Sequence, residues 1–213
     1  MKILTALIAA LLLCSCSMVN KHSKYVGSAS DALRSTVLVS TKDGSGSGFH
    51  IGGGIFITNA HVVLDRHGNV PLDPVYLLDG APAELIAYDD GKDLAMLRCP
   101  LKSNLKPFKL SLAAIKLKDD VLSVGWHFGV IEVASKGFVS GMVDGAIITT
   151  APSNHGCSGG PLTNTSFEVI GVNAFGYSPD YSWSGISGHI DIKTLVSFLN
   201  DCRDEYNKEL NAR

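Results

Sequence analysis

Gly156-Cys157-Ser158-Gly159-Gly160-Pro161 is the stretch from which the rest of this chain can be interpreted. A serine hydroxyl is a weak nucleophile at neutral pH and needs a neighbouring base to take its proton. Glycines beside it let the main chain turn tightly, so that backbone N–H groups meet at one point and can stabilise an oxyanion. The stretch therefore indicates acyl transfer at Ser158, with the N–H groups of Gly156 and Ser158 as the oxyanion hole.

Two upstream runs supply partners for this serine: Thr58-Asn59-Ala60-His61 and Lys92-Asp93-Leu94-Ala95. Histidine, then aspartate, then serine is one known order of a catalytic triad. In that arrangement His61 takes the proton of Ser158, and Asp93 holds the imidazole in the required tautomer. A glycine-flanked serine alone is usually only a turn, but the three runs together predict a catalytic triad of His61, Asp93 and Ser158.

With these motifs the chain resembles the trypsin-like serine proteases, and most closely the bacterial HtrA/DegP branch. The resemblance covers most of residues 35–199 and rests on five motifs in the family order. They are Gly46-Ser47-Gly48-Phe49, Ile57-Thr58-Asn59-Ala60-His61-Val62-Val63, Asp93-Leu94-Ala95-Met96-Leu97, Gly156-Cys157-Ser158-Gly159-Gly160-Pro161-Leu162 and Val169-Ile170-Gly171-Val172-Asn173. The histidine and serine motifs are specific, whereas the aspartate motif is less so.

This resemblance implies an all-β fold of two six-stranded antiparallel β-barrels with a C-terminal helix. His61 and Asp93 then come from the first barrel and Ser158 from the second. The implied activity is that of a serine endopeptidase, which cleaves protein or peptide substrates through an acyl-enzyme and uses no cofactor. We expect the protease domain over residues 31–213, with barrel 1 at about 31–105, barrel 2 at about 106–190 and the helix at about 191–207.

The residue pattern supports the same architecture. Short runs rich in β-branched or aromatic residues, bounded by Gly, Asp, Asn or Pro, predict strands. These runs cover residues 35–41, 75–78, 85–88, 94–98, 121–126, 146–150 and 168–175. Near the C-terminus Asp191 can cap a helix in which Ile192, Leu195, Val196 and Leu199 form one apolar stripe. We expect this stripe to dock on a barrel.

The N-terminus has the features of an export signal. Lys2 precedes an apolar stretch over residues 3–13, which is too short to span a bilayer as a helix. The following cysteines resemble a bacterial lipobox, in which Cys16 becomes the acylated first residue; an ordinary secretory signal cut nearby is the alternative. We expect a signal peptide at residues 1–15, a tether at 16–30 and a lipoprotein of the cell envelope, anchored in the outer membrane and facing the periplasm.

Composition limits the partners. Removing residues 1–15 takes away one lysine and changes the formal net charge from −2 to −3, which is too small to indicate nucleic acid as a partner. No set of residues has the spacing of a metal site. Cys99 and Cys202 either form a disulfide that pins the terminal helix or remain two buried thiols. The oligomeric state stays open.

Substrate preference can be inferred from the positions that determine it in the family. Basic-specific members carry an aspartate where this chain has Pro152, and glutamate-specific members carry a histidine where it has Asn173. We therefore expect cleavage after small or medium uncharged residues. The predicted pocket consists of Pro152, Ser153, Asn154, Ala174, Phe175, Gly176 and Ser187, with a backbone edge at 174–176 for an extended substrate. His189 either reaches the base of this pocket or is a structural histidine.

A protease-like scaffold that binds peptides or envelope proteins without cutting them is the alternative function. His155 and Cys157 replace the Arg and Asn that are usual in the HtrA branch, and either change could distort the oxyanion turn. Cys157 stands one residue before the nucleophile position, so a cysteine protease is not expected. The chain ends near Arg213, and we expect no PDZ module of the kind found in HtrA proteases.

Overall fold

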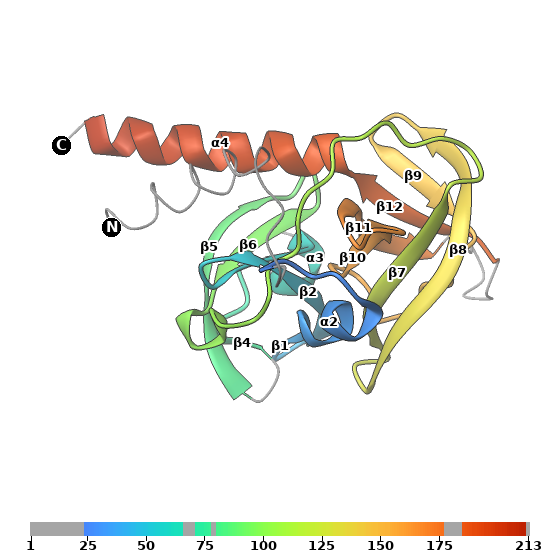
Figure 1. Ribbon diagram of the computed structural model, residues 1–213. Helices are drawn as coiled ribbons and strands as arrows, with labels where there is room; N and C mark the ends of the chain where they lie inside the picture. Colours follow the sequence, from blue (N-terminus) through green and yellow to red (C-terminus); the bar gives the residue numbers. More distant parts are fainter. Residues whose placement is uncertain (1–23, 66–70, 78–79, 177–184, 212–213) are drawn as a thin grey trace.

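Two closed six-stranded antiparallel barrels form the framework of the computed structural model (Figure 1), which describes residues 24–65, 71–77, 80–176 and 185–211. The predicted fold class is therefore confirmed. Each barrel is formed by six strands that follow one another in the chain, so that strand residues from the N-terminal and C-terminal halves meet where the barrels touch.

Barrel 1 has the strand order β1-β2-β3-β6-β5-β4. Its strands are β1 (Thr36–Thr41), β2 (Gly44–Gly52), β3 (Ile55–Thr58), β4 (Val75–Leu77), β5 (Ala81–Asp89) and β6 (Leu94–Arg98). Apolar side chains such as Val39, Phe56 and Leu97 fill its interior. β3 pairs with β6, with Thr58 opposite Ala95, and this pairing brings the ends of two predicted motifs together.

Barrel 2 has the order β10-β11-β12-β9-β8-β7. Its strands are β7 (Asp120–His127), β8 (Ile131–Val143), β9 (Ala146–Thr149), β10 (Pro161–Asn164), β11 (Val169–Gly176) and β12 (Ser187–Asp191). The loop between β9 and β10 carries the glycine-rich serine motif. The loop leaves from β9, which pairs with β12, and it ends at β10, which pairs with β11 with Pro161 opposite Val172. Both ends of the loop are therefore anchored in the sheet.

Within the described residues, the helices are short except for the last. They are α2 (Ala29–Arg34), α3 (Ala60–Val63), the 3₁₀ turn η2 (Pro100–Lys102) and α4 (Ile192–Asn211). Asp191 accepts a hydrogen bond from the backbone N–H of Thr194 at 2.8 Å, as expected of its capping position. α4 leaves barrel 2 at β12 and crosses over barrel 1 (Figure 1), where Asp201 pairs with Lys92.

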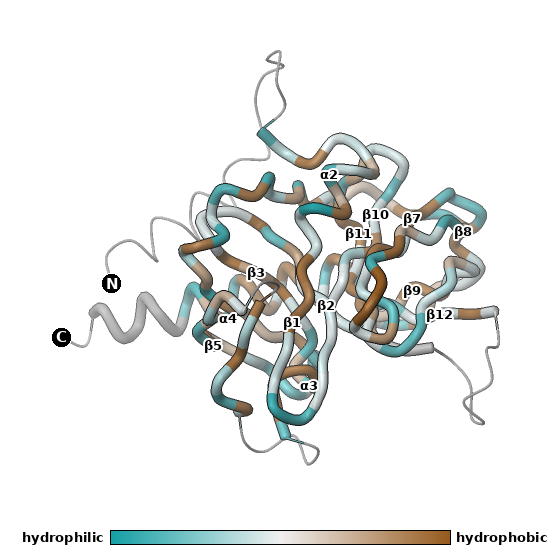
Figure 2. Tube along the Cα trace, turned by 90° about the horizontal axis from the view of Figure 1, so that it is seen from below, coloured by the Kyte–Doolittle hydropathy of each residue, from teal (hydrophilic) through white to brown (hydrophobic). Residues whose placement is uncertain are grey.

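The largest hydrophobic cluster joins the two barrels to α4. It contains Phe49 and Ile57 from barrel 1, Val124 and Val172 from barrel 2, and Leu195 from α4. Hydrophobic segments follow the strands, while hydrophilic ones gather in the connections (Figure 2). The predicted stripe of α4 is thus buried as expected, and the interface between the barrels is a packed core.

Five strands lie outside the seven predicted runs, and all seven of those runs contain a strand. β2 was not expected as a strand because four of its nine residues are glycine, which disfavours strands, yet most of it is buried. β8 is half-exposed along most of its length and lacks a regular alternation. Neighbouring strands hold both in place, so tertiary pairing overrides local propensity here.

The predicted signal peptide and Cys16 lie outside the described residues. Of the expected tether, residues 24–30 are described, and this part lies against the domain. Val26 is buried, and its N–H donates to Pro107 O at 3.0 Å. Ser28 caps α2 by accepting from Asp31 N. Among the described helices, none has the length and apolar character needed to cross a membrane.

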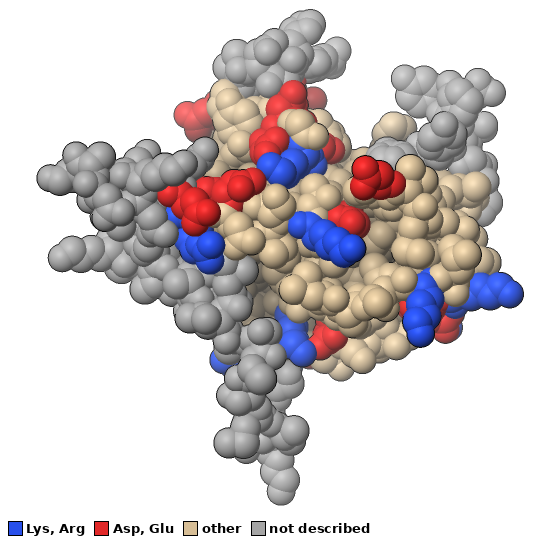
Figure 3. Space-filling view, turned by 90° about the horizontal axis from the view of Figure 1, so that it is seen from above, with Lys and Arg blue, Asp and Glu red and all other residues tan. Residues whose placement is uncertain are grey.

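On the face seen in Figure 3, acidic and basic side chains lie interspersed over mostly uncharged surface, in keeping with the small net charge. The possible disulfide is absent, because Cys99 and Cys202 are both free thiols. Cys99 is packed in the interior of barrel 1, whereas Cys202 packs against the cluster that joins the barrels to α4. Different cores therefore hold the two sulfurs.

Candidate active site

His61 and Asp93 are in direct contact. His61 lies on α3, directly after β3, and Asp93 lies on the turn between β5 and β6. The distance from His61 Nδ1 to Asp93 Oδ2 is 2.8 Å, and the backbone N–H of His61 donates to Asp93 Oδ1 at 3.0 Å. Asn59 Nδ2 donates to the backbone oxygen of Asp93 at 2.9 Å. These bonds hold the carboxylate and the imidazole in one orientation.

The same contacts determine the tautomer of His61. A carboxylate can only accept hydrogen bonds, so Nδ1 carries the hydrogen in the neutral ring. Nε2 is then left with a lone pair and can accept a proton from another group. This is the state that a general base requires.

Ser158 lies across the barrel interface from His61. Both residues line a cavity of about 290 Å³, together with His155, Gly156 and residues of the β1–β2 hairpin. Ser158 Oγ donates to the backbone oxygen of Ala174 at 3.2 Å. Within the described residues, no hydrogen bond joins this hydroxyl to His61. In this state the hydroxyl is directed at the main chain of β11. Rotation of a serine side chain is a small and fast change.

The turn around Ser158 has the backbone form that its glycines allow. Gly156 has a φ of 91° and Gly159 a φ of 87°, in the region that other residues rarely adopt. A Cβ on Gly156 would lie 2.3 Å from Trp126 O, and one on Gly159 would lie 2.2 Å from Ser47 O. Both glycines are therefore required by the conformation and by the close approach of neighbouring strands.

The two N–H groups predicted to form the oxyanion hole are available. Within the described residues, neither Gly156 N nor Ser158 N donates to a backbone or side-chain acceptor. The carbonyl groups of their peptide units are occupied: His155 O accepts from Phe128 N at 2.6 Å, and Cys157 O accepts from Gly160 N at 2.9 Å. Because N–H and C=O point in opposite directions in a trans peptide, these bonds set the direction of both free N–H groups.

The residues predicted for the specificity pocket are distributed on both sides of this turn. Ser153 and Ser187 are buried, and Pro152, Asn154 and Ala174 are half-buried. None of these lines the cavity that His61 and Ser158 share. Residues 174–176 belong to β11, as expected for a backbone edge near the serine, and the side chains of residues 175 and 176 lie outside the description.

His189 is a fully buried member of a polar network. Its Nδ1 lies 2.9 Å from Asn173 Oδ1, and its Nε2 lies 2.8 Å from Thr149 Oγ1. Asn173 Oδ1 can only accept, so Nδ1 is the donor and Nε2 accepts from the threonine hydroxyl. Burial lowers the pKa of His189 to about 3, which keeps the ring neutral. Both ring nitrogens are satisfied within the protein, which favours the structural interpretation of this histidine.

Cys157 does not have the properties of a second nucleophile. Its thiol is buried, and burial raises its pKa, so the reactive thiolate is disfavoured. No group of three His, Cys, Asp or Glu side chains in the described part of the chain could hold a metal ion.

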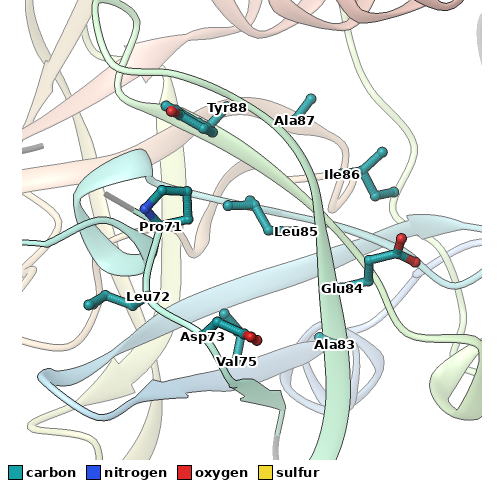
Figure 4. A pocket seen from close by; sticks show the side chains of 10 residues that line it. All are labelled: Pro71, Leu72, Asp73, Val75, Ala83, Glu84, Leu85, Ile86, Ala87 and Tyr88. Atoms are coloured by element: carbon teal, nitrogen blue, oxygen red, sulfur yellow. The ribbon is translucent and has the colours of Figure 1, made fainter. Parts of the chain in front are cut away.

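A second cavity, of about 550 Å³, lies on barrel 1 between β5 and the segment that leads into β4 (Figure 4). Its lining is mostly apolar, with Asp73 and Glu84 as the charged side chains. None of the predicted site residues contributes to it. Its lining therefore offers no chemistry related to the serine motif.

Two residues that touch the site, Asn59 and Ser47, carry no role predicted from the sequence. Asn59 binds the backbone of Asp93, and the fully buried Ser47 binds the backbone of the serine turn. Both stand inside motifs that were recognised, next to residues of predicted function. Position within a motif was therefore the available signal, but only the folded structure shows what each side chain contacts.

The chain also matches known proteins. Residues 46–172 match the family model of the trypsin-like peptidase domain. Protease Do-like 1, chloroplastic, from Arabidopsis thaliana is 32% identical over 178 residues, which cover 74% of this chain and 39% of that protein. The periplasmic serine endoprotease DegP of Salmonella typhimurium is 32% identical over 169 residues, 72% of this chain and 35% of that protein. The chain thus spans well under half the length of these relatives.

Solved structures show the same likeness. The HtrA-type protease AlgW with tripeptide superposes with a TM-score of 0.72 at 26% identity, covering 84% of this chain and 64% of that chain. The serine endoprotease from Yersinia pestis superposes with a TM-score of 0.71 at 22% identity, covering 87% of this chain and 68% of that chain, and at this identity it shows the fold alone.

Proposed function

This chain belongs to the trypsin-like peptidase family, with HtrA-type proteases among its relatives, and from that premise we propose that it is a serine endopeptidase. Ser158 is the nucleophile, His61 the general base and Asp93 the group that orients His61. The observation that carries the proposal is that His61, hydrogen-bonded to Asp93, lines the same cavity as Gly156 and Ser158. The N–H groups of those two residues have no acceptor among the described residues.

The proposed reaction begins when Ser158 Oγ turns from Ala174 O towards His61 Nε2. His61 takes the hydroxyl proton as Oγ bonds to the carbonyl carbon of the substrate, and the carbonyl oxygen becomes an oxyanion beside the N–H groups of Gly156 and Ser158. His61 then gives its proton to the leaving amine, and an acyl-enzyme forms. A water molecule, deprotonated by His61, attacks the ester, and the proton returns to Ser158 Oγ as the acid leaves.

The substrate class follows from the same site. An extended peptide can pair with the backbone of residues 174–176 in β11, as strands add to a sheet edge. Pro152 offers no negative charge to a basic side chain, and the neutral, satisfied ring of His189 offers no positive charge to an acidic one. These features support cleavage after small or medium uncharged residues.

The non-cutting scaffold is kept as a second candidate because Ser158 donates to Ala174 O and not to His61. His155 and Cys157 suggested the scaffold because they differ from the residues usual in the HtrA branch, but their backbone groups are hydrogen-bonded within the turn. His155 points its carbonyl at Phe128 N, and Cys157 is buried with its N–H bonded to Asn154 O at 3.0 Å. In the described part of the chain, Gly156 N and Ser158 N have no acceptor, which supports the enzyme over the scaffold.

Export and lipid anchoring also belong to this proposal. The apolar leader and Cys16 support a lipoprotein of the cell envelope, held at the outer membrane and facing the periplasm. The Salmonella relative is named as a periplasmic endoprotease, which is in keeping with that compartment. In such a place the natural substrates would be envelope proteins or their unfolded segments.

The decisive experiment compares the wild-type protein with Ser158→Ala on an unfolded protein substrate and with a fluorophosphonate probe. We expect the wild type to cleave the substrate and to be labelled, and Ser158→Ala to lose turnover by more than about a thousandfold together with all labelling. Ser197→Ala removes an exposed hydroxyl on α4 and serves as the matched control, with unchanged activity. A wild-type protein that binds peptides but neither cleaves nor reacts with the probe would support the scaffold instead.

A further inference from the structure

Ser47 is a fully buried hydroxyl of β2 in barrel 1 that reaches across to barrel 2. Its Oγ donates to Gly156 O at 2.7 Å and accepts from the N–H of Trp126 at 2.8 Å. The hydroxyl therefore joins strand β7 to the serine turn through one donated and one accepted bond. Neither of these bonds belongs to a regular strand ladder.

The backbone of Ser47 holds the same turn at a second point. Its N–H donates to Ser158 O at 2.7 Å. Its own carbonyl accepts from Thr58 Oγ1 at 2.7 Å, which anchors Ser47 to β3 immediately before the segment that carries His61. One residue of barrel 1 thus binds the carbonyl groups of both Gly156 and Ser158, the two residues whose N–H groups are free.

These contacts constrain the residue with the greatest rotational freedom in the turn. Gly156 has no Cβ, so its flanking peptide units could rotate more easily than those of other residues. The unit before it is held by the bond from Phe128 N to His155 O. The unit after it is held at its carbonyl by Ser47 Oγ and at its N–H by the bond from Cys157 N to Asn154 O. With both units held, the direction of the Gly156 N–H is fixed beside the cavity that Gly156 lines.

We propose that Ser47 is a positioning residue that holds the oxyanion hole in its working form across the interface between the barrels. This inference rests on the proposed protease function and adds a residue to it. Without the hydroxyl, Gly156 O and Trp126 N lose a buried partner. The peptide after Gly156 then keeps the bond from Cys157 N to Asn154 O but loses the one at its carbonyl, so Gly156 gains freedom to rotate. The N–H of Gly156 then spends less time directed at the developing oxyanion, so turnover falls while substrate binding in the ground state changes little.

The test measures kcat, KM and the affinity of a peptidyl trifluoromethyl ketone for Ser47→Ala, with active sites counted by fluorophosphonate titration. The ketone forms a tetrahedral adduct whose oxyanion needs the hole. We expect kcat to fall about ten- to a hundredfold, short of the roughly hundred- to thousandfold loss from removing a whole donor. KM should stay close to wild type, and the ketone affinity should fall in parallel with kcat.

Thr36→Val is the matched control, because Thr36 is also a buried hydroxyl of barrel 1 and donates to Ala32 O at 2.9 Å. It should lower the thermal midpoint to a similar degree and leave kcat and ketone affinity unchanged. Unchanged kcat and ketone affinity in folded Ser47→Ala would overturn the inference, and so would an equal loss in Thr36→Val.

A second variant covers the possibility that Ser47→Ala does not fold. Ser47→Cys keeps the shape of the side chain but donates a weaker hydrogen bond, so kcat and ketone affinity should again fall together. Wild-type values for Ser47→Cys would also count against a positioning role. If the wild-type protein itself neither reacts with the fluorophosphonate nor binds the ketone, the proposed function fails, and the inference falls with it.

Discussion

His189 shows how burial and hydrogen bonds determine the charge of a single residue. Its folded-state pKa is lowered from 6.5 to about 3, whereas the unfolded chain keeps the ordinary value. The unfolded state therefore binds a proton first as the pH falls, and the stability that depends on neutral His189 is present above pH 6.5 and is lost progressively from there towards pH 3.

We therefore expect His189→Gln to flatten the acid side of the stability profile. Chemical denaturation at a series of pH values between 6.5 and 4 should give a smaller fall in the free energy of unfolding for the variant than for the wild type. The comparison concerns the slopes, because the substitution also alters the bonds to Asn173 and Thr149 and lowers stability at every pH. Equal slopes would show that His189 does not titrate in this way.

At the scale of secondary-structure elements, α4 is the element that sequence periodicity describes best. Its buried side chains Ile192, Leu195 and Leu199 belong to the cluster that contains residues of both barrels. Asp201 on its outer side pairs with Lys92 at 3.0 Å, next to the turn that carries Asp93. The helix is therefore part of the framework around the site, and the stripe that predicts it also predicts where it docks.

Truncating a side chain of this apolar stripe should destabilise the whole domain. Leu195 is fully buried, so Leu195→Ala removes apolar contacts and leaves a cavity, which typically lowers the free energy of unfolding by about 2–5 kcal/mol. Urea denaturation followed by circular dichroism measures the loss. Lys193→Ala, at an exposed position of the same helix, should change stability by less than about 0.5 kcal/mol. A similar small effect for Leu195→Ala would mean that α4 does not pack as described.

For the molecule as a whole, the important surface is the one between the barrels. Trp126 Nε1 donates to Thr36 O at 3.3 Å, and Ser47 binds the serine turn, so hydrogen bonds as well as apolar contacts join the two halves. His61 and Asp93 stand on one side and Ser158 on the other. The relative position of the barrels therefore controls the distance over which the proposed proton transfer takes place.

A methyl group added at the interface between the barrels should lower both stability and turnover. A Cβ on Gly125 would lie 3.0 Å from Cys157 Cα and 3.1 Å from Ser47 Oγ, closer than ordinary contact. We expect Gly125→Ala to destabilise the protein by about 1–3 kcal/mol and to lower kcat, measured by denaturation and by peptide hydrolysis. Gly27→Ala, whose nearest neighbouring atom would be 4.0 Å away, is the control and should change neither. Wild-type kcat in Gly125→Ala would show that the interface tolerates this displacement.

Local pattern was sufficient for part of the architecture and insufficient for the rest. The runs at residues 35–41 and 121–126 become β1 and β7 because β-branched and apolar residues fit a buried strand. β2 could not be recognised in this way, since its glycines allow many conformations and only pairing with β1 and β3 selects the extended one. The same limit applies to residues 24–30, where tertiary contacts such as those of Val26 show that the chain lies on the domain.

The sequence by itself determined which groups are candidates for chemistry, because a nucleophile, a base and an orienting carboxylate each require a residue type in a short local context. It also determined the two-barrel fold, through motifs in a family order. Only the tertiary structure decided how the oxyanion turn is held, since Ser47 and Gly156 are 109 residues apart in the chain. Contacts over such separations arise when two barrels pack together, and no local pattern of residues encodes them.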